Sequence, residues 1–134
     1  MTKSGHVYII SNIGAFGENI YKIGMTRRLD PMDRVNELGD ASVPFPFDVH
    51  AIIFCQNAPE LEKQLHKRFH HRRVNKVNER KEFFKVDLEE IAEAVKQIAE
   101  ETKSIQGKVH ITRAAAAIDY RKTIAMLEQT YQAK

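Results

Sequence analysis

The amino-acid sequence predicts an α+β fold, in which a small mixed or antiparallel β-sheet is flanked by helices. Short segments rich in β-branched and aromatic residues alternate with longer segments that carry apolar residues at helical spacing. Glycine and proline separate these segments. The hydrophobic share of 43% is enough for one core in a chain of 134 residues.

The first two elements are expected to form a β-hairpin. Residues 6–11 and 20–24 are rich in β-branched and aromatic side chains, which favour strands. Gly14 and Gly17 lie between them and allow the chain to turn. The hairpin is therefore predicted to have a long connection.

A helix, a strand and a second helix are expected next. Asp30 and Pro31 favour a helix start, and Gly39 favours its end. Residues 47–55 are predicted to form the third strand. The polar residues at 57–60 resemble a capping box, so a second helix is expected to begin there.

Three helices are indicated by apolar residues at spacings of three and four. The first runs to about residue 70, the second begins with an expected capping box at Asp87 and Glu90, and the third begins near Thr112. A short strand is predicted over 82–86, between the first two helices. The stripes are Leu61, Leu65 and Phe69; Ile91, Val95 and Ile98; and Tyr120, Ile124, Leu127 and Tyr131.

The predicted organisation is a domain at residues 1–88 followed by a C-terminal helical extension at 89–134. The extension could act as a cap, a linker or an oligomer contact, which leaves a homodimer or a larger parent protein open. No run reaches the ~20 apolar residues of a membrane span, so no membrane contact is expected from this chain. The single cysteine, Cys55, excludes a disulfide within the chain and favours a cytoplasmic location.

Positive charge is concentrated in one stretch of a chain whose net charge is only +3. Eight basic residues lie between 63 and 81, where Glu79 is the one acid. Such a stretch indicates a polyanion site, although a solvated helix face would have the same composition. The residues expected to contact nucleic acid are Lys22, Lys67, Arg72, Arg73 and Lys76.

Four residues are candidates for phosphodiester chemistry. Tyr8 and Tyr21 lie on the predicted hairpin, Arg34 on the first helix and Glu62 near the start of the second. Taken singly, each has an ordinary structural explanation, such as strand packing or a solvated helix surface. Mg²⁺, however, often binds through one or two carboxylates with water and substrate phosphate, so Glu62 alone could suffice.

Taken together, these residues resemble the GIY-YIG nuclease superfamily over about residues 5–88. The likeness rests on the order and spacing of the motifs. More closely, the sequence resembles the branch named for a meiotically up-regulated gene and a phage open reading frame. The matching motifs are His6-Val7-Tyr8, Tyr21-Lys22-Ile23-Gly24-Met25-Thr26, Arg34, Leu61-Glu62-Lys63-Gln64-Leu65-His66 and Glu82-Phe83-Phe84.

The resemblance implies a metal-dependent endonuclease with weak sequence specificity, acting on nucleic acid and expected to act on DNA. It implies that Glu62 binds Mg²⁺ or Mn²⁺, that Arg34 holds a phosphate oxygen and that a tyrosine is the general base, with Tyr8 favoured over Tyr21. This branch is associated with antiviral defence against phage. The alternatives are a catalytically inactive nucleic-acid-binding module on the same fold and a purely structural interaction domain.

The accessory residues depart from the superfamily pattern. Gly5 precedes His6 instead of occupying the usual glycine position, and Lys22 is inserted in the second signature. Leu38 stands where many relatives have a histidine or a lysine. The residues that transfer protons and bind phosphate therefore remain open at this point.

Four residues could take these accessory roles. His50 is expected on the third strand, and His66 lies four residues after Glu62 and so on the same helix face. Glu82 or Asn78 occupies the region where relatives carry an asparagine. His66 and Glu82 are accordingly added to the candidate catalytic residues.

Overall fold

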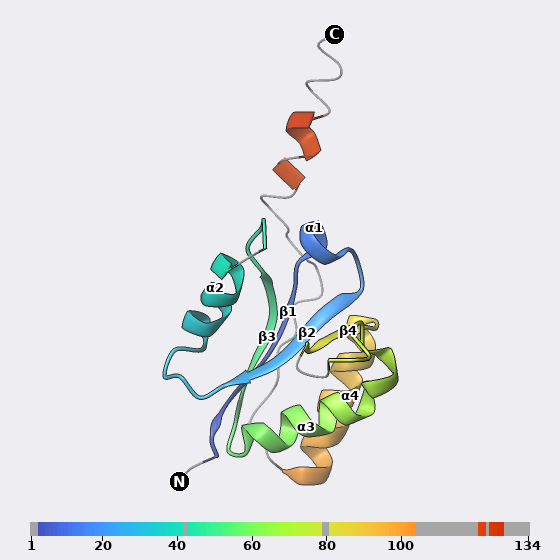
Figure 1. Cartoon of the computed structure of the whole chain (residues 1–134). Coiled ribbons are helices and arrows are strands. Elements are labelled where there is room, and N and C mark those ends of the chain that lie inside the picture. The colour runs from blue at the N-terminus through green and yellow to red at the C-terminus, as the bar shows by residue number, and fades with distance from the viewer. Residues whose placement is uncertain (1–2, 42, 79–80, 104–120, 123, 128–134) are drawn as a thin grey trace.

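The chain folds into one antiparallel sheet with helices on both faces, which confirms the predicted α+β class (Figure 1). The computed structural model describes residues 3–41, 43–78, 81–103, 121–122 and 124–127. Its elements are β1 (Gly5–Ser11), α1 (Ile13–Phe16), β2 (Ile20–Thr26), α2 (Pro31–Ala41), β3 (Asp48–Cys55), α3 (Ala58–Arg68), η1 (His70–Arg72), β4 (Phe83–Lys85) and α4 (Leu88–Thr102).

The four strands lie in the order β3-β1-β2-β4, and every neighbouring pair is antiparallel. The predicted hairpin is thus the centre of the sheet, with the short helix α1 in its connection. The register pairs Tyr8 with Gly24 and Ile10 with Lys22. Since directly opposed residues share a face, these four side-chain positions lie on one face of the sheet.

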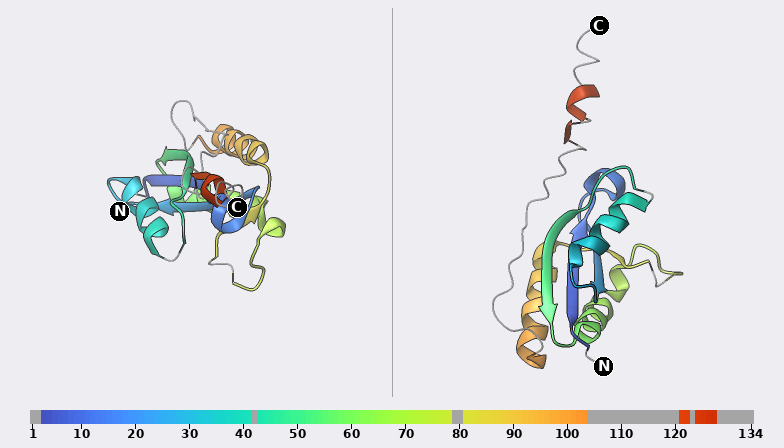
Figure 2. Two further views of the ribbon diagram at one scale, coloured as in Figure 1. Left: turned by 90° about the horizontal axis from the view of Figure 1, so that it is seen from above. Right: turned by 90° about the vertical axis from the view of Figure 1, so that its left-hand side faces the viewer.

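The two faces of the sheet are covered by different helices. Helices α3 and α4 cover the main core, which includes Val7, Ile9 and Ile23. Helix α2 covers a smaller cluster that is centred on Tyr8 and Ile10. Figure 2 shows α2 and α4 on opposite sides of the sheet.

Helix α4 belongs to the main core. The same cluster contains residues of α3, of the strands and of α4, so the packing continues past residue 88. The predicted stripe of Ile91, Val95 and Ile98 is confirmed as buried, each side chain being no more than 1% exposed. Of the predicted last helix, residues 121–122 and 124–127 are helical, and the rest lies outside the described residues.

Side chains of asparagine and aspartate set most of the helix starts. Asn57 accepts a hydrogen bond from the Glu60 amide at 3.3 Å, and Asp30 accepts one from Met32 at 2.9 Å, as predicted. The expected capping box at Asp87 is wrong, because its side chain makes no cap hydrogen bond. Among the described helices, none combines the length and apolar character that crossing a membrane would require.

Candidate active site

Tyr8 is held at the centre of the sheet because its cross-strand partner is a glycine. The phenol, only 2% exposed, lies directly over Gly24. A Cβ at Gly24 would come within 2.6 Å of Tyr8 Cε2, closer than real side chains approach. Gly24 therefore leaves the space that the Tyr8 ring occupies.

Arg34 reaches this phenol from helix α2. The neighbouring Val35 is 2% exposed and anchors the helix on the sheet. The Arg34 guanidinium lowers the pKa of the Tyr8 hydroxyl, against the larger effect of burial, and its Nη1 lies 3.6 Å from Glu37 Oε2. Its side chain is 43% exposed, so it is also open to a ligand.

Glu62 is placed at the edge of β2 by helix α3. Leu61 and Leu65, both fully buried, fix the helix and leave Glu62 half-buried beside the sheet. Burial raises the pKa of Glu62 to about 7, with a further contribution from the charge of Glu82 and an opposing one from Lys22. A carboxylate in this position is stabilised by any added cation.

At the outer edge of β2, two different groups form hydrogen bonds with the backbone of Ile23. Its amide donates to the Glu82 carbonyl at 3.2 Å, and His66 Nε2 lies 2.6 Å from its carbonyl oxygen. A carbonyl oxygen only accepts, so Nε2 carries the proton and Nδ1 of the neutral ring keeps its lone pair. Burial also lowers the pKa of His66, which favours this neutral form.

Glu62, His66 and Glu82 form a group that fits a divalent cation. Each offers one ligand atom, and these atoms all lie within 4.8 Å of one another. Carboxylate oxygens suit Mg²⁺ and Mn²⁺, and a histidine whose other nitrogen donates to a backbone carbonyl is a common metal ligand. Burial first and the charge of Glu82 second raise the pKa of Glu62, and a bound cation would oppose both effects.

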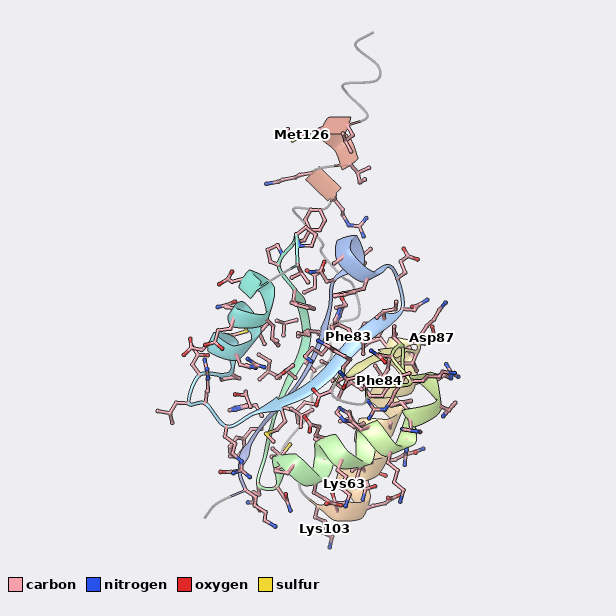
Figure 3. All side chains as sticks on the ribbon, in the orientation of Figure 1. Lys63, Phe83, Phe84, Asp87, Lys103 and Met126 are labelled. Carbon is pink, nitrogen blue, oxygen red and sulfur yellow. The ribbon has the colours of Figure 1, made fainter. Side chains whose placement is uncertain are left out.

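Lys22 lies in the same neighbourhood and not on the outer surface. The residue is only 8% exposed, and its Nζ is 3.5 Å from Glu82 Oε2. The ammonium group also lies 5.2 Å from the ring centre of Phe83, a residue labelled in Figure 3. Burial lowers the pKa of Lys22, while Glu82 opposes that change. The structure thus places this expected surface contact among the site carboxylates.

Tyr21 lies on the opposite face of the sheet from Tyr8. It belongs to the main core, and its ring packs edge-on against His50 with ring centres 5.3 Å apart. Burial raises the pKa of Tyr21, followed by the charges of Asp87 and Glu18. The structure therefore does not bring Tyr21 or His50 together with Tyr8, because successive residues of a strand point to opposite faces.

The predicted nucleic-acid-binding cations also divide into two groups. Lys67 and Lys76 are exposed. Arg73, in contrast, is 7% exposed, lies 5.0 Å from the ring centre of Phe84 and donates to His70 at 3.2 Å. The guanidinium of Arg73 is thus used in packing within the described structure, while its predicted contact with nucleic acid stays a prediction.

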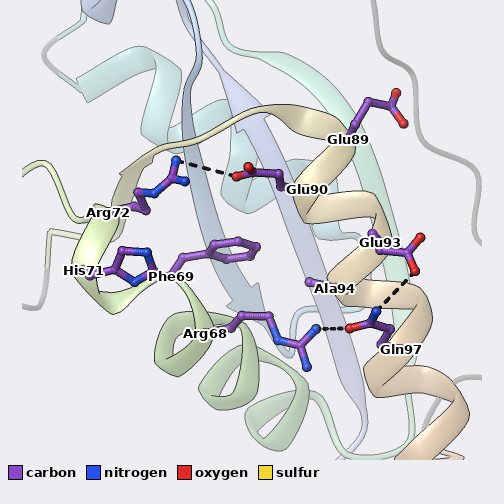
Figure 4. A pocket seen from close by; sticks show the side chains of 9 residues that line it. All are labelled: Arg68, Phe69, His71, Arg72, Glu89, Glu90, Glu93, Ala94 and Gln97. Atoms are coloured by element: carbon purple, nitrogen blue, oxygen red, sulfur yellow. Dashed lines mark hydrogen bonds and ion pairs between the residues drawn. The ribbon is translucent and has the colours of Figure 1, made fainter.

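Arg72 faces a groove between η1 and α4, shown in Figure 4. Its guanidinium lies 3.6 Å from Glu90, and nearby Arg68 donates to Gln97 at 2.6 Å. The groove has a volume of about 470 Å³. Its lining residues are Arg68, Phe69, His71, Arg72, Glu89, Glu90, Glu93, Ala94 and Gln97. Glutamates and arginines face each other across this groove, so the predicted contact of Arg72 with nucleic acid would compete with its ion pair to Glu90.

The position of Lys22 was the main feature that the sequence interpretation missed. A signal was present, because a strand places alternate residues on one face. Counting back two from Gly24, which opposes Tyr8, gives Lys22 and not Tyr21. Glu82, by contrast, was predicted in this region and does lie within the group around Glu62.

The fold and the candidate site define an α+β domain in which Arg34 and two carboxylates interact electrostatically with a tyrosine of a central strand. The sequence profile of the T5orf172 domain matches residues 5–99, and the chain belongs to this family. The domain of this family derives from a phage open reading frame and is associated with nuclease-related superfamilies. Membership is consistent with a nuclease-like or DNA-binding module. Neither curated proteins nor solved structures gave a match to this chain.

Proposed function

We propose that this domain is a divalent-metal-dependent endonuclease of the GIY-YIG type that hydrolyses phosphodiester bonds in DNA. The observation that carries the proposal is the convergence of Tyr8, Arg34 and Glu62 from β1, α2 and α3. The charges of Arg34, Glu62 and Glu82 all act on the Tyr8 hydroxyl. A guanidinium, a phenol and a carboxylate pair at one point are suited to a single phosphate group.

Each residue has a distinct part in the proposed reaction. Hydrolysis adds a water oxygen to phosphorus, breaks one P–O ester bond and transfers a proton to the leaving oxygen. Arg34 would hold a phosphoryl oxygen with its planar, permanently charged fork. Glu62, with His66 and Glu82, would hold Mg²⁺ or Mn²⁺. The bound ion would supply positive charge to the phosphoryl and leaving oxygens.

Tyr8 is protonated at neutral pH in the free protein. Burial raises its pKa, Glu82 and Glu62 raise it further, and Arg34 lowers it. The phenol therefore begins as a donor that can orient water or phosphate. Neutralising the two carboxylates would remove two causes of the raised pKa, which would move Tyr8 towards the general-base role.

Lys67 on α3 and Lys76 in the loop before β4 support a nucleic-acid-binding surface. Both are exposed, and lysine contacts to the backbone would position the duplex without reading bases. Weak sequence preference follows. A role in antiviral defence is an extension of this proposal, drawn from the phage origin of the family.

The proposal is tested by incubating the purified chain with supercoiled DNA, linear DNA and RNA. Cleavage of DNA is expected with Mg²⁺ or Mn²⁺, and excess chelator should abolish it. Glu62→Gln should keep the fold and lose cleavage. Glu60→Gln is the matched control, because Glu60 is on the same helix but binds Gln64 at 3.0 Å. Cleavage that persists in chelator would contradict the metal requirement.

An inactive binding module would give a different result. It would bind DNA with an affinity that falls as salt rises, and it would cut nothing in either metal. Binding measured by fluorescence anisotropy alongside the cleavage assay separates the two functions.

A further inference from the structure

The ammonium group of Lys22 is nearly buried, and its hydrogen-bond donors are only partly used. A charge taken out of water requires close partners, and an ammonium group has three donors to satisfy. Among the described residues, its one hydrogen-bonding partner is Glu82, at the long distance of 3.5 Å. The Phe83 ring adds a weaker contact with one side of the group. At least one further acceptor would fit this environment.

The position of Lys22 on the sheet directs it to the proposed reaction site. It opposes Ile10, so its side chain emerges on the same face as Tyr8, which opposes Gly24. Arg34, Glu62 and Glu82 all act electrostatically on Lys22, and the same three act on Tyr8. Lys22 and Tyr8 therefore share three charged neighbours on one region of the sheet.

Tyr21 has none of these neighbours. The charges that act on it belong to Asp87 and Glu18, and its ring packs on His50 within the main core. Its hydroxyl would have to cross the sheet to reach a phosphate held by Arg34. The position after the tyrosine, and not the tyrosine itself, is therefore directed towards that phosphate.

We infer that Lys22 is a catalytic residue whose ammonium group binds a non-bridging oxygen of the scissile phosphate, and that the neighbouring candidate, Tyr21, does not take part in the reaction. The inference rests on the proposed nuclease function. The ligand is chemically a phosphodiester. An anionic oxygen would give the Lys22 ammonium the acceptor that it lacks, and the positive charge would assist negative charge developing in the transition state.

The test compares Lys22→Met with Tyr21→Phe in the full chain. Single-turnover cleavage at saturating protein should fall about 100-fold or more in Lys22→Met, the scale of removing a charged group from the reacting centre. Duplex affinity should change by less than about threefold, because many other phosphates contribute to it. Tyr21→Phe should stay within about threefold of the wild-type rate. Lys22→Arg, which keeps the charge, should recover part of the lost rate.

A structural role for Lys22 would produce a different pattern. The rate loss would then follow a loss of thermal stability, and Lys22→Gln, with its polar tip, would restore both. Equal rates for Lys22→Met and wild type would overturn the inference and leave the nuclease proposal intact.

A second readout does not depend on cleavage. Binding of a short 5′-phosphorylated oligonucleotide in Ca²⁺, followed by ³¹P NMR, should weaken about tenfold in Lys22→Met and be unchanged in Tyr21→Phe. If the wild type cuts nothing, the nuclease proposal fails while this measurement still reports on Lys22. Equal phosphate binding by wild type and Lys22→Met would exclude the contact.

Discussion

The two faces of strand β2 differ more than their adjacent residues suggest. On one face, Lys22 and Gly24 lie with Tyr8 among charged side chains that remain partly open to solvent. On the other face, Tyr21 and Ile23 are sealed in the main core under α3 and α4. A shift of one residue along a strand thus separates the candidate site from structural packing.

This difference shows that the function of a residue in a short strand motif can be assigned only when the face of the sheet on which it lies is known. Both faces carry a tyrosine with a pKa raised by burial. Only Tyr8 has a guanidinium beside its hydroxyl and carboxylates nearby. The charged groups around each hydroxyl, and not the hydroxyl alone, therefore determine which tyrosine is suited to phosphodiester chemistry.

The largest effect is expected from removing the Tyr8 hydroxyl, and Tyr21→Phe serves as its comparison. Tyr8→Phe should lower single-turnover cleavage about 100-fold, the scale of general acid–base catalysis, at a cost of about 1 kcal/mol in the free energy of unfolding. Tyr21→Phe should leave the rate within about threefold. Single-turnover assays with thermal melting measure both. Equal losses in the two variants would mean that the faces do not differ in function.

A somewhat smaller effect is expected at the glycine that accommodates Tyr8. Gly24→Ala should displace the phenol, lower cleavage about tenfold or more and destabilise the fold by about 1–3 kcal/mol. Gly39→Ala is the control, because its nearest new contact would be an ordinary 3.7 Å and alanine favours helix α2. Denaturant unfolding and cleavage rates report the outcome. Unchanged cleavage by Gly24→Ala would show that the Tyr8 position is not needed.

The salt dependence of duplex binding should respond to the exposed Lys67 and Lys76 and not to the buried Arg73. Changing Lys67 and Lys76 to Gln should reduce the slope of log affinity against log salt by about 0.9 for each lost phosphate contact on duplex DNA. Arg73→Lys should lower thermal stability, because it loses the stacked guanidinium, and leave that slope unchanged. A slope that changes only with Arg73 would reverse the assignment of these residues.

The smallest effect concerns stability and pH at Glu62. Its pKa rises from the usual 4.5 to about 7 on folding. Between these values the folded protein holds a proton that the unfolded chain releases, so the free energy of unfolding falls as pH rises. Glu62→Gln should remove that decrease, which amounts to about 1 kcal/mol for a half-buried group, or about 4 °C in Tm at pH 8. A difference in Tm between wild type and Glu62→Gln that is the same at pH 5 and at pH 8 would contradict this prediction.

Much of the fold was predictable because its elements depend on local patterns. Alternation and helical spacing gave the strands, the stripe of α3 and the stripe of α4. The continuity of the core past residue 88 was not predictable, since a helical stripe does not identify the face it packs on. The burial of Arg73 was not predictable for a related reason: only the fold places the Phe84 ring beneath its guanidinium.

The site was predicted in composition but not in arrangement. Tyr8, Arg34 and Glu62 were found from motif order, and the structure brings them together. The choice between Tyr21 and Lys22 depends on strand register, which pairs Tyr8 with Gly24. Register is set by packing of the whole sheet, so the motif alone left it undetermined.

The packing of α4 sets the smallest unit of this chain that could be transplanted into another protein. A chain ended at residue 88 would leave the apolar surface that Ile91, Val95 and Ile98 cover open to water. Such a fragment is expected to aggregate when expressed alone. Fusion partners therefore belong after Thr102, where α4 ends. Since α4 lies on the opposite side of the sheet from α2, a partner joined there starts away from the face that carries Tyr8 and Lys22.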